Sequence, residues 1–134
     1  MSWSHWSPQM RSVLRIIASL LFIEHGLMKL FHFPGPLPGV SDPLPLMYIA
    51  AAVFELVGGS LIAIGLFTRV AAFVCSGEMA VGYFLIHAPH GFWPGLNQGE
   101  AAILFCFIFL YISLAGPGPW SIDARMPWRG SAIN

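Results

Sequence analysis

Long uninterrupted apolar segments dominate this sequence and restrict the folds that are open to it. Four of them cover about residues 13–31, 46–67, 70–87 and 100–115. A helix needs about 20 apolar residues to cross a bilayer, and the last two segments are on the short side. The strands of a membrane β-barrel would instead alternate polar and apolar residues over about ten positions. We therefore predict an all-α, integral membrane four-helix bundle that forms a single domain over residues 1–134.

The composition supports a membrane protein. The chain is 57% hydrophobic and 9% charged, and its mean hydropathy is +0.73, which lies outside the range of ordinary soluble domains. The formal net charge is zero, so the basic surface of a nucleic-acid-binding protein is absent and the predicted partner is the lipid bilayer. The first segment is long, contains Glu24 and Lys29, and is not followed by a small-residue cleavage site. We expect it to be retained rather than removed as a signal peptide.

The basic residues predict the orientation of the helices. The arginines lie beside one end of the apolar segments, at positions Arg11, Arg15, Arg69, Arg125 and Arg129. By the positive-inside rule, the regions that contain them lie in the cytoplasm. We predict a multi-pass protein of the bacterial inner membrane with both the N-terminus and the C-terminus in the cytoplasm.

Aromatic residues and prolines mark the ends of the predicted helices. We expect an aromatic belt at the cytoplasmic interface formed by Trp3, Trp6, Trp120 and Trp128. Phe92 and Trp93 mark the opposite interface. The segment 33–45 has five prolines and two glycines, so it cannot continue a helix and is predicted to be a turn-rich outer loop.

Each apolar segment contains a glutamate inside it or at its edge: Glu24, Glu55, Glu78 and Glu100. A carboxylate in hydrocarbon costs a few kcal/mol or more, so it persists where it faces a protein interior, has a partner or performs a function. With a helical rise of ~1.5 Å per residue, all four lie at mid-depth or in the outer half of the bundle. We predict that these groups converge in one pocket that opens away from the cytoplasm.

Four histidines and the one lysine of the chain are predicted to lie in the same outer half of the bundle as the glutamates. His25, Lys29 and His32 are spaced i, i+4, i+7, which places them on one face of the first helix. His87 and His90 lie at the end of the third. Lys29 can neutralise one glutamate, and another is expected to hold a proton, because like charges in a low dielectric cannot all ionise. The alternative is an ion-pair network that only locks the bundle, although an excess of carboxylates is a costly way to obtain packing.

A metal site is a second alternative. The di-iron pattern Glu-x-x-His fails, because the third residue after each glutamate is Leu27, Gly58, Val81 or Ile103. A copper or iron ion held by His25, His87 or His90 with a glutamate remains open.

The two cysteines have no metal-binding or redox spacing. Cys75 and Cys106 are predicted to be small packing residues in the third and fourth helices. The alternative is a redox pair between these helices. Their different predicted depths argue against a disulfide.

Several short stretches resemble the DoxX family of small four-helix membrane proteins. In chain order they are HGLMKL at 25–30, ELVGG at 55–59, GLFTR at 65–69, NQGE at 97–100 and GPGPWSID at 116–123. Some members of that family are subunits of a thiosulfate:quinone oxidoreductase, and others are grouped with redox-stress systems. The resemblance implies a polar core that consists of His25, Lys29, Glu55, Asn97 and Glu100. It also marks Arg69 and Asp123 on the cytoplasmic side, where we expect Asp123 to pair with Arg69 or Arg125 in a structural clamp.

We predict a quinone-linked oxidoreductase subunit. Its candidate catalytic residues are Glu55, Glu100, Lys29 and His25, and its candidate cofactor-binding residues are Glu24, Glu78, Asn97 and His87. The sequence has no electron-carrier motif, so this role implies a partner membrane subunit or a redox protein. Two other functions stay open: a non-catalytic accessory subunit of a larger membrane complex, and transport of a metal ion or small acid by a homo-oligomer.

Overall fold

The computed structural model describes residues 2–126, and within that range the regular structure is entirely helical. The prediction of an all-α chain is therefore confirmed. Trp128 and Arg129, which we assigned to the cytoplasmic interface, lie outside the described residues.

The first helix is longer than the sequence predicted. A short 3₁₀ turn, Trp3–Trp6, leads into α1 (Ser7–Phe31), whose first turn contains Pro8. Proline suits this position because the first helical N–H groups have no intrahelical acceptor. The helix ends at His32, which adopts a left-handed conformation. Arg11 and Arg15 therefore lie inside α1 and do not precede it.

The second and third helices are each composed of several parts. The second consists of α2 (Leu46–Val53), a π-helical turn (Phe54–Gly58) and α3 (Gly59–Ile64). It ends before residue 67 because Gly65 turns the chain with φ 73°. The third consists of α4 (Thr68–Gly82), a second π-helical turn (Tyr83–His87) and a 3₁₀ turn (Ala88–His90).

The last part of the chain closes the bundle. The short helix α5 (Pro94–Asn97) precedes α6 (Glu100–Ala115), and a final 3₁₀ turn covers Asp123–Arg125. Pro117 and Pro119 follow α6, where they prevent the helix from continuing.

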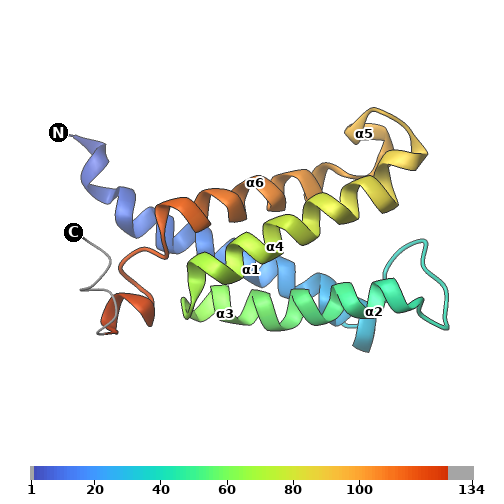
Figure 1. Ribbon diagram of the computed structural model, residues 1–134, viewed down its shortest axis with the longest axis horizontal. Helices are drawn as coiled ribbons and strands as arrows, with labels where there is room; N and C mark the ends of the chain where they lie inside the picture. Colours follow the sequence, from blue (N-terminus) through green and yellow to red (C-terminus); the bar gives the residue numbers. More distant parts are fainter. Residues whose placement is uncertain (1, 127–134) are drawn as a thin grey trace.

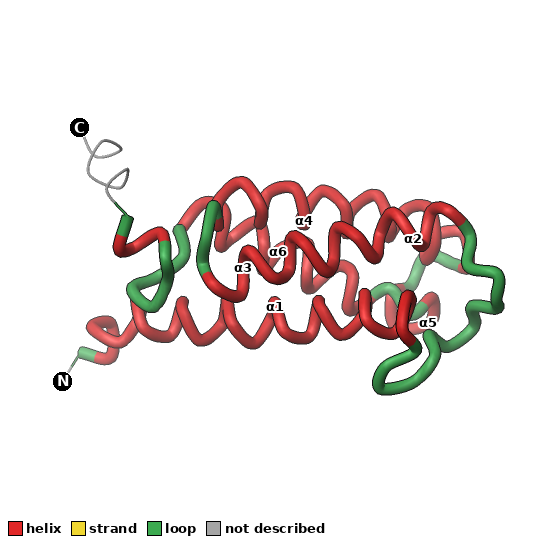
Figure 2. Tube along the Cα trace, turned by 90° about the horizontal axis from the view of Figure 1, so that it is seen from below, coloured by secondary structure: helices red, strands yellow, loops and turns green. Residues whose placement is uncertain are grey.

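The helices lie side by side in two closely packed pairs. Helix α4 packs most extensively on α6, and α1 packs on α2 and α3. Both ends of the described chain lie at one end of the molecule, and α5 and the loop before α2 lie at the other (Figures 1 and 2). Toward the α5 end the two pairs diverge (Figure 1).

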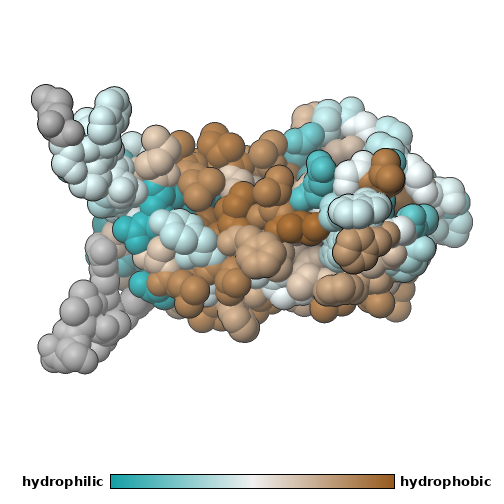
Figure 3. Space-filling view, turned by 90° about the horizontal axis from the view of Figure 1, so that it is seen from above, coloured by the Kyte–Doolittle hydropathy of each residue, from teal (hydrophilic) through white to brown (hydrophobic). Residues whose placement is uncertain are grey.

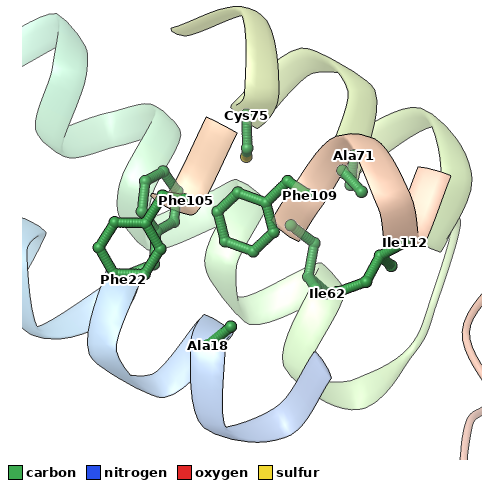
Figure 4. Close-up of a cluster of buried hydrophobic side chains, with 9 residues drawn as sticks. Ala18, Phe22, Ile62, Ala71, Cys75, Phe105, Phe109 and Ile112 are labelled. Carbon is green, nitrogen blue, oxygen red and sulfur yellow. The ribbon is translucent and has the colours of Figure 1, made fainter. Parts of the chain in front are cut away.

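A cluster of aromatic side chains joins the two pairs at the centre of the molecule (Figure 4). Phe22 of α1 packs edge to face on Phe109 of α6, with ring centroids 4.9 Å apart, and lies 5.4 Å from the ring of Phe105. The small residues Ala18, Ala71 and Cys75 let the helices approach around these rings. This core holds the four helices together at the centre of the molecule. The two pairs separate between this core and the α5 end (Figure 1).

The outer surface is largely apolar between two more polar ends (Figure 3). Large hydrophobic side chains are exposed on every long helix, including Leu20, Val57, Phe73 and Leu104. The stretches Leu46–Ile64 and Thr68–His90 are each long and apolar enough to cross a membrane. An exposed apolar surface of this extent is typical of a protein that faces lipid.

The tryptophans occupy the two ends of the molecule. Trp3, Trp6 and Trp120 are exposed at the end that holds the termini, and Trp93 is exposed at the α5 end. This distribution matches the interface positions expected from the sequence, as far as the described residues reach.

Candidate functional site

A pocket of about 870 Å³ opens where the two helix pairs diverge. Its walls are mainly apolar and include Phe22, Met79 and Phe105. Its polar lining groups come from different helices and the turns beside them: His25, Lys29, Glu55, Glu78, His87, His90, Asn97 and Gln98, with Tyr48 at α2. A pocket of this size with few polar groups is typical of a small-molecule site.

Lys29 and Glu55 form the central ion pair of the pocket. The Lys29 Nζ atom lies 2.5 Å from Glu55 Oε1, and the two side chains are 10% and 2% exposed. The second carboxylate oxygen, Glu55 Oε2, is buried and has no hydrogen-bond partner in the described residues. Because a buried carboxylate oxygen without a partner is costly, this atom marks a position that a ligand donor would stabilise.

Glu78 places a second acidic group in the same pocket. It projects from α4, and its Oε2 atom is also buried without a hydrogen-bond partner in residues 2–126. The ion pairs found in this range do not include Glu78. The pocket therefore has two carboxyl groups and one lysine, and each carboxyl group has an oxygen without a hydrogen-bond partner in the described residues.

Three histidines are held in fixed orientations at the pocket wall, among them His90, whose Nδ1 lies 2.8 Å from the Ile86 carbonyl oxygen. His25 Nδ1 lies 2.9 Å from the Leu21 carbonyl oxygen, and the His25 ring contacts the Phe105 ring edge to face at 5.7 Å. His87 Nδ1 lies 3.1 Å from the Asn97 carbonyl oxygen. Since each Nδ1 is paired with a backbone acceptor, the opposite ring nitrogen is the one that can interact with a ligand.

Asn97 holds together the segment 83–99 at the α5 end of the molecule. Its amide nitrogen donates to the Gly91 carbonyl at 2.9 Å and to the Tyr83 hydroxyl at 3.2 Å, and its side-chain oxygen accepts from the Gly99 N–H at 2.8 Å. Asn97 was predicted to bind a cofactor. It lines the pocket, but its amide already has partners from the protein, so its contribution is to fix this segment.

Glu24 and Glu100 do not line this pocket. Glu24 is half-buried on α1, and Glu100 is exposed in the first turn of α6, where a negative charge interacts favourably with the helix dipole. The prediction that all four glutamates converge is therefore wrong. Two of them, Glu55 and Glu78, share the pocket with Lys29.

Two of the polar pocket residues lie on π-helical turns that the sequence did not reveal. Glu55 belongs to the turn Phe54–Gly58, and His87 ends the turn Tyr83–His87. Each π turn inserts an extra residue into its helix and thereby rotates the side chains that follow. Such turns are rare and frequently mark functional sites, which supports this location.

No metal site is evident in the part of the chain that the structure describes. Among residues 2–126, groups of three or more His, Cys, Asp or Glu side chains placed to hold a metal ion are not found. Both cysteines are free thiols.

The opposite end of the bundle is a clamp of buried polar groups. Arg15 is fully buried, and its guanidinium donates to the carbonyl oxygens of Ile62, Ala63, Pro117 and Trp120 at 2.5–2.8 Å. Arg15 thus satisfies carbonyls at the end of α3 and in the segment after α6. A charged residue beside an apolar segment was the only sequence signal for this role.

The expected pairing of Asp123 with an arginine is wrong. Asp123 accepts from the backbone N–H groups of Phe67 and Thr68 at 2.9 and 2.8 Å, so it caps the start of α4. Arg69 instead donates to the carbonyl oxygens of Ser113 and Leu114 at the end of α6. Polar contacts do hold this region together, as predicted. The side chains of Arg15, Arg69 and Asp123 make these contacts with backbone groups.

Comparisons with known proteins identify relatives of this chain. The family model for DoxX matches residues 10–88. An uncharacterized protein of Haemophilus influenzae is 42% identical over 127 residues, covering 90% of this chain and 92% of the relative. An uncharacterized membrane protein of Mycobacterium tuberculosis is 25% identical, covering 89% and 82%. The inner membrane protein YphA of Escherichia coli is 28% identical, covering 88% and 91%. No solved structure gives a significant match.

Proposed function

The chain belongs to the DoxX family of membrane proteins, and we propose that its pocket binds the headgroup of a quinone or quinol as part of a redox-linked membrane system. The observation that carries this proposal is a pair of buried carboxyl oxygens, Glu55 Oε2 and Glu78 Oε2, that have no hydrogen-bond partner among residues 2–126 and lie in a mainly apolar pocket. A flat apolar ring with opposed polar oxygens suits such a lining, because the ring packs on apolar walls while its oxygens meet the few polar groups.

The proposal includes a topology in the membrane. Four helical rods cross the bacterial inner membrane with both termini in the cytoplasm, and the pocket lies in the half that faces away from it. The arrangement favours this orientation because Arg11, Arg15 and Arg69 contact the segment 113–120 at the end that holds the termini. Helix α6 has 16 residues, about 24 Å, so it spans the hydrocarbon only where the bilayer is thin or where the α5 segment extends it.

The residues of the pocket have distinct roles in this proposal. Lys29 Nζ, already oriented by Glu55, donates a hydrogen bond to a quinone carbonyl. Oxidation of a quinol to the quinone releases two electrons and two protons. Glu78 Oε2 accepts a hydrogen bond from one quinol hydroxyl and takes its proton, and the Glu55 carboxylate beside Lys29 takes the proton of the other hydroxyl. The bound ring supplies the two-electron redox chemistry. The electrons pass to or from a partner redox protein with a metal or flavin centre, because the sequence has no motif for such a carrier.

Ligand binding to the purified protein tests the proposal. In lipid nanodiscs, titration calorimetry with a tail-less methoxy-benzoquinone and with its quinol should show saturable binding. Glu78→Gln should weaken quinol binding roughly tenfold, because it replaces a carboxyl oxygen with the weaker acceptor of a neutral amide that cannot take up the proton. The matched control is Glu100→Gln, which lies outside the pocket and should bind like the wild type.

Two results would contradict the proposal. The first is the absence of saturable binding of either ring to the wild-type protein, which would favour an accessory subunit. The second is equal quinol affinity for Glu78→Gln and Glu100→Gln, which would remove the assigned role of the buried carboxyl group.

A further inference from the structure

A second cavity lies on the outer surface of the bundle, between the α2–α3 rod and α4. It has a volume of about 320 Å³, and its lining is almost wholly apolar. Residues of the α2–α3 rod form one wall, from Val53 to Leu61, and residues of α4 and the turn before it form the other, from Phe67 to Cys75. We call this cavity the lateral groove.

The lateral groove and the pocket share two lining residues. Phe54, on the π-helical turn, and Val74, on α4, line both cavities. They lie on opposite walls and are 46% and 43% exposed, so the boundary between the cavities consists of two side chains at the outer surface. The pocket and the lateral groove therefore adjoin at these two side chains, on the surface between the α2–α3 rod and α4.

The dimensions of the lateral groove suit a hydrocarbon chain. From Val53 to Leu61 the rod advances about 12 Å, at a rise of ~1.5 Å per residue. The groove is narrow at Gly58, where an added Cβ would lie only 2.4 Å from Cys75 Sγ. Val57 and Val70 line it with small branched side chains that are 58% and 70% exposed.

We propose that the lateral groove holds the isoprenoid tail of the quinone whose headgroup occupies the pocket, and that this ligand enters from the bilayer between Phe54 and Val74. This inference rests on the proposed function. A tailed ligand dissolved in lipid reaches the polar groups of the pocket without passing through water. Its headgroup passes between Phe54 and Val74, and its tail stays among apolar side chains. The tail exchanges mobile lipid chains for the fixed apolar walls of the groove, so the van der Waals contacts made there add to the affinity of a tailed ligand and set its orientation.

The test uses larger side chains that fill the groove without touching the pocket. Val57→Phe and Val70→Phe change residues that line only the lateral groove, and Leu104→Phe is the matched control on the lipid-facing side of α6. Two probes are titrated into nanodiscs of fixed lipid content: the tail-less benzoquinone, and the same headgroup with a decyl tail. Both groove variants should weaken binding of the tailed probe about tenfold, leave the tail-less probe unchanged, and differ from the control.

A photoreactive group at the end of the tail gives a second readout. Mass spectrometry of the cross-linked wild-type protein should locate the label on the segments 57–61 and 67–70. A label on α6 instead, or unchanged affinity of the tailed probe for both groove variants, would overturn the inference while the proposed function stands. Suppression of the cross-link by excess phospholipid but not by unlabelled tailed quinone would assign the groove to a lipid acyl chain and would also overturn it. Failure of both probes to bind the wild-type protein would refute the proposed function, and this inference with it.

Discussion

The ion pair in the pocket can be tested by removing its cation. Lys29→Met keeps a side chain of similar length but leaves Glu55 without a positive charge. Glu55 is 1% exposed, and the atoms of the pair are 2.5 Å apart, so water does not readily replace the ammonium group. Breaking a buried pair by removing one partner typically costs about 3–5 kcal/mol. We expect the free energy of unfolding to fall by about 3 kcal/mol, at the low end of that range, because uptake of a proton by Glu55 limits the cost.

The double variant separates the ion pair from other effects of the substitution. Lys29→Met with Glu55→Gln removes both charges of this pair, so neither is left buried without its partner, and we expect a loss of only about 1 kcal/mol relative to wild type. Glu55→Gln alone leaves Lys29 without its anion, so the losses of the two single variants should not add up to the smaller loss of the double variant. Arg125→Met, at an exposed cation, serves as the control and should change stability by about 0.5 kcal/mol or less.

The assay is equilibrium unfolding in mixed detergent and sodium dodecyl sulfate micelles, followed by circular dichroism. If Lys29→Met is as stable as the wild type, the buried pair does not stabilise the native state. If the losses of the two single variants simply add in the double variant, the two side chains do not interact. Either result would refute the geometry on which the pocket argument depends.

Two further predictions concern the end that holds the termini. Arg15→Met should lower the free energy of unfolding by about 4 kcal/mol, about 1 kcal/mol for each of four carbonyls that lose their donor, and the same unfolding assay checks this. Equal stability of this variant and the wild type would contradict the clamp. Gly65→Ala should be strongly destabilised, because φ is +73° and the new Cβ would lie 2.3 Å from Ser121 Cβ, whereas Gly77→Ala, with open space around it in α4, should gain up to about 1 kcal/mol. The reverse order of these two melting temperatures would refute the packing of α3 against the segment after α6.

The sequence predicted that Lys29 neutralises one buried glutamate, but it did not identify which one. The structure shows that the partner is Glu55, in the neighbouring helix. Glu24 and Glu78 are both inside apolar segments, and hydropathy alone cannot distinguish them. Which of the two faces the pocket depends on the rotation of each helix about its axis. That rotation is set by packing around the Phe22 cluster.

Other features could not be read from the sequence because they depend on backbone geometry. The π-helical turns at Phe54–Gly58 and Tyr83–His87 have no composition that distinguishes them from α-helix. The role of Arg15 was missed because arginines near helix ends are usually explained by the positive-inside rule. Its partners are backbone carbonyls, and only the three-dimensional arrangement places them within reach.

The central claim is that Lys29 and Glu78 meet the polar oxygens of a ring inside the pocket. The most direct test is a high-resolution structure of the wild-type protein in nanodiscs, determined after saturation with the tailed benzoquinone. We predict ring density between the two helix pairs, with one ring oxygen within hydrogen-bond distance of Lys29 Nζ and the opposite one close to Glu78 Oε2. Density for the ring elsewhere on the bundle, with the pocket unchanged at saturating ligand, would contradict the account.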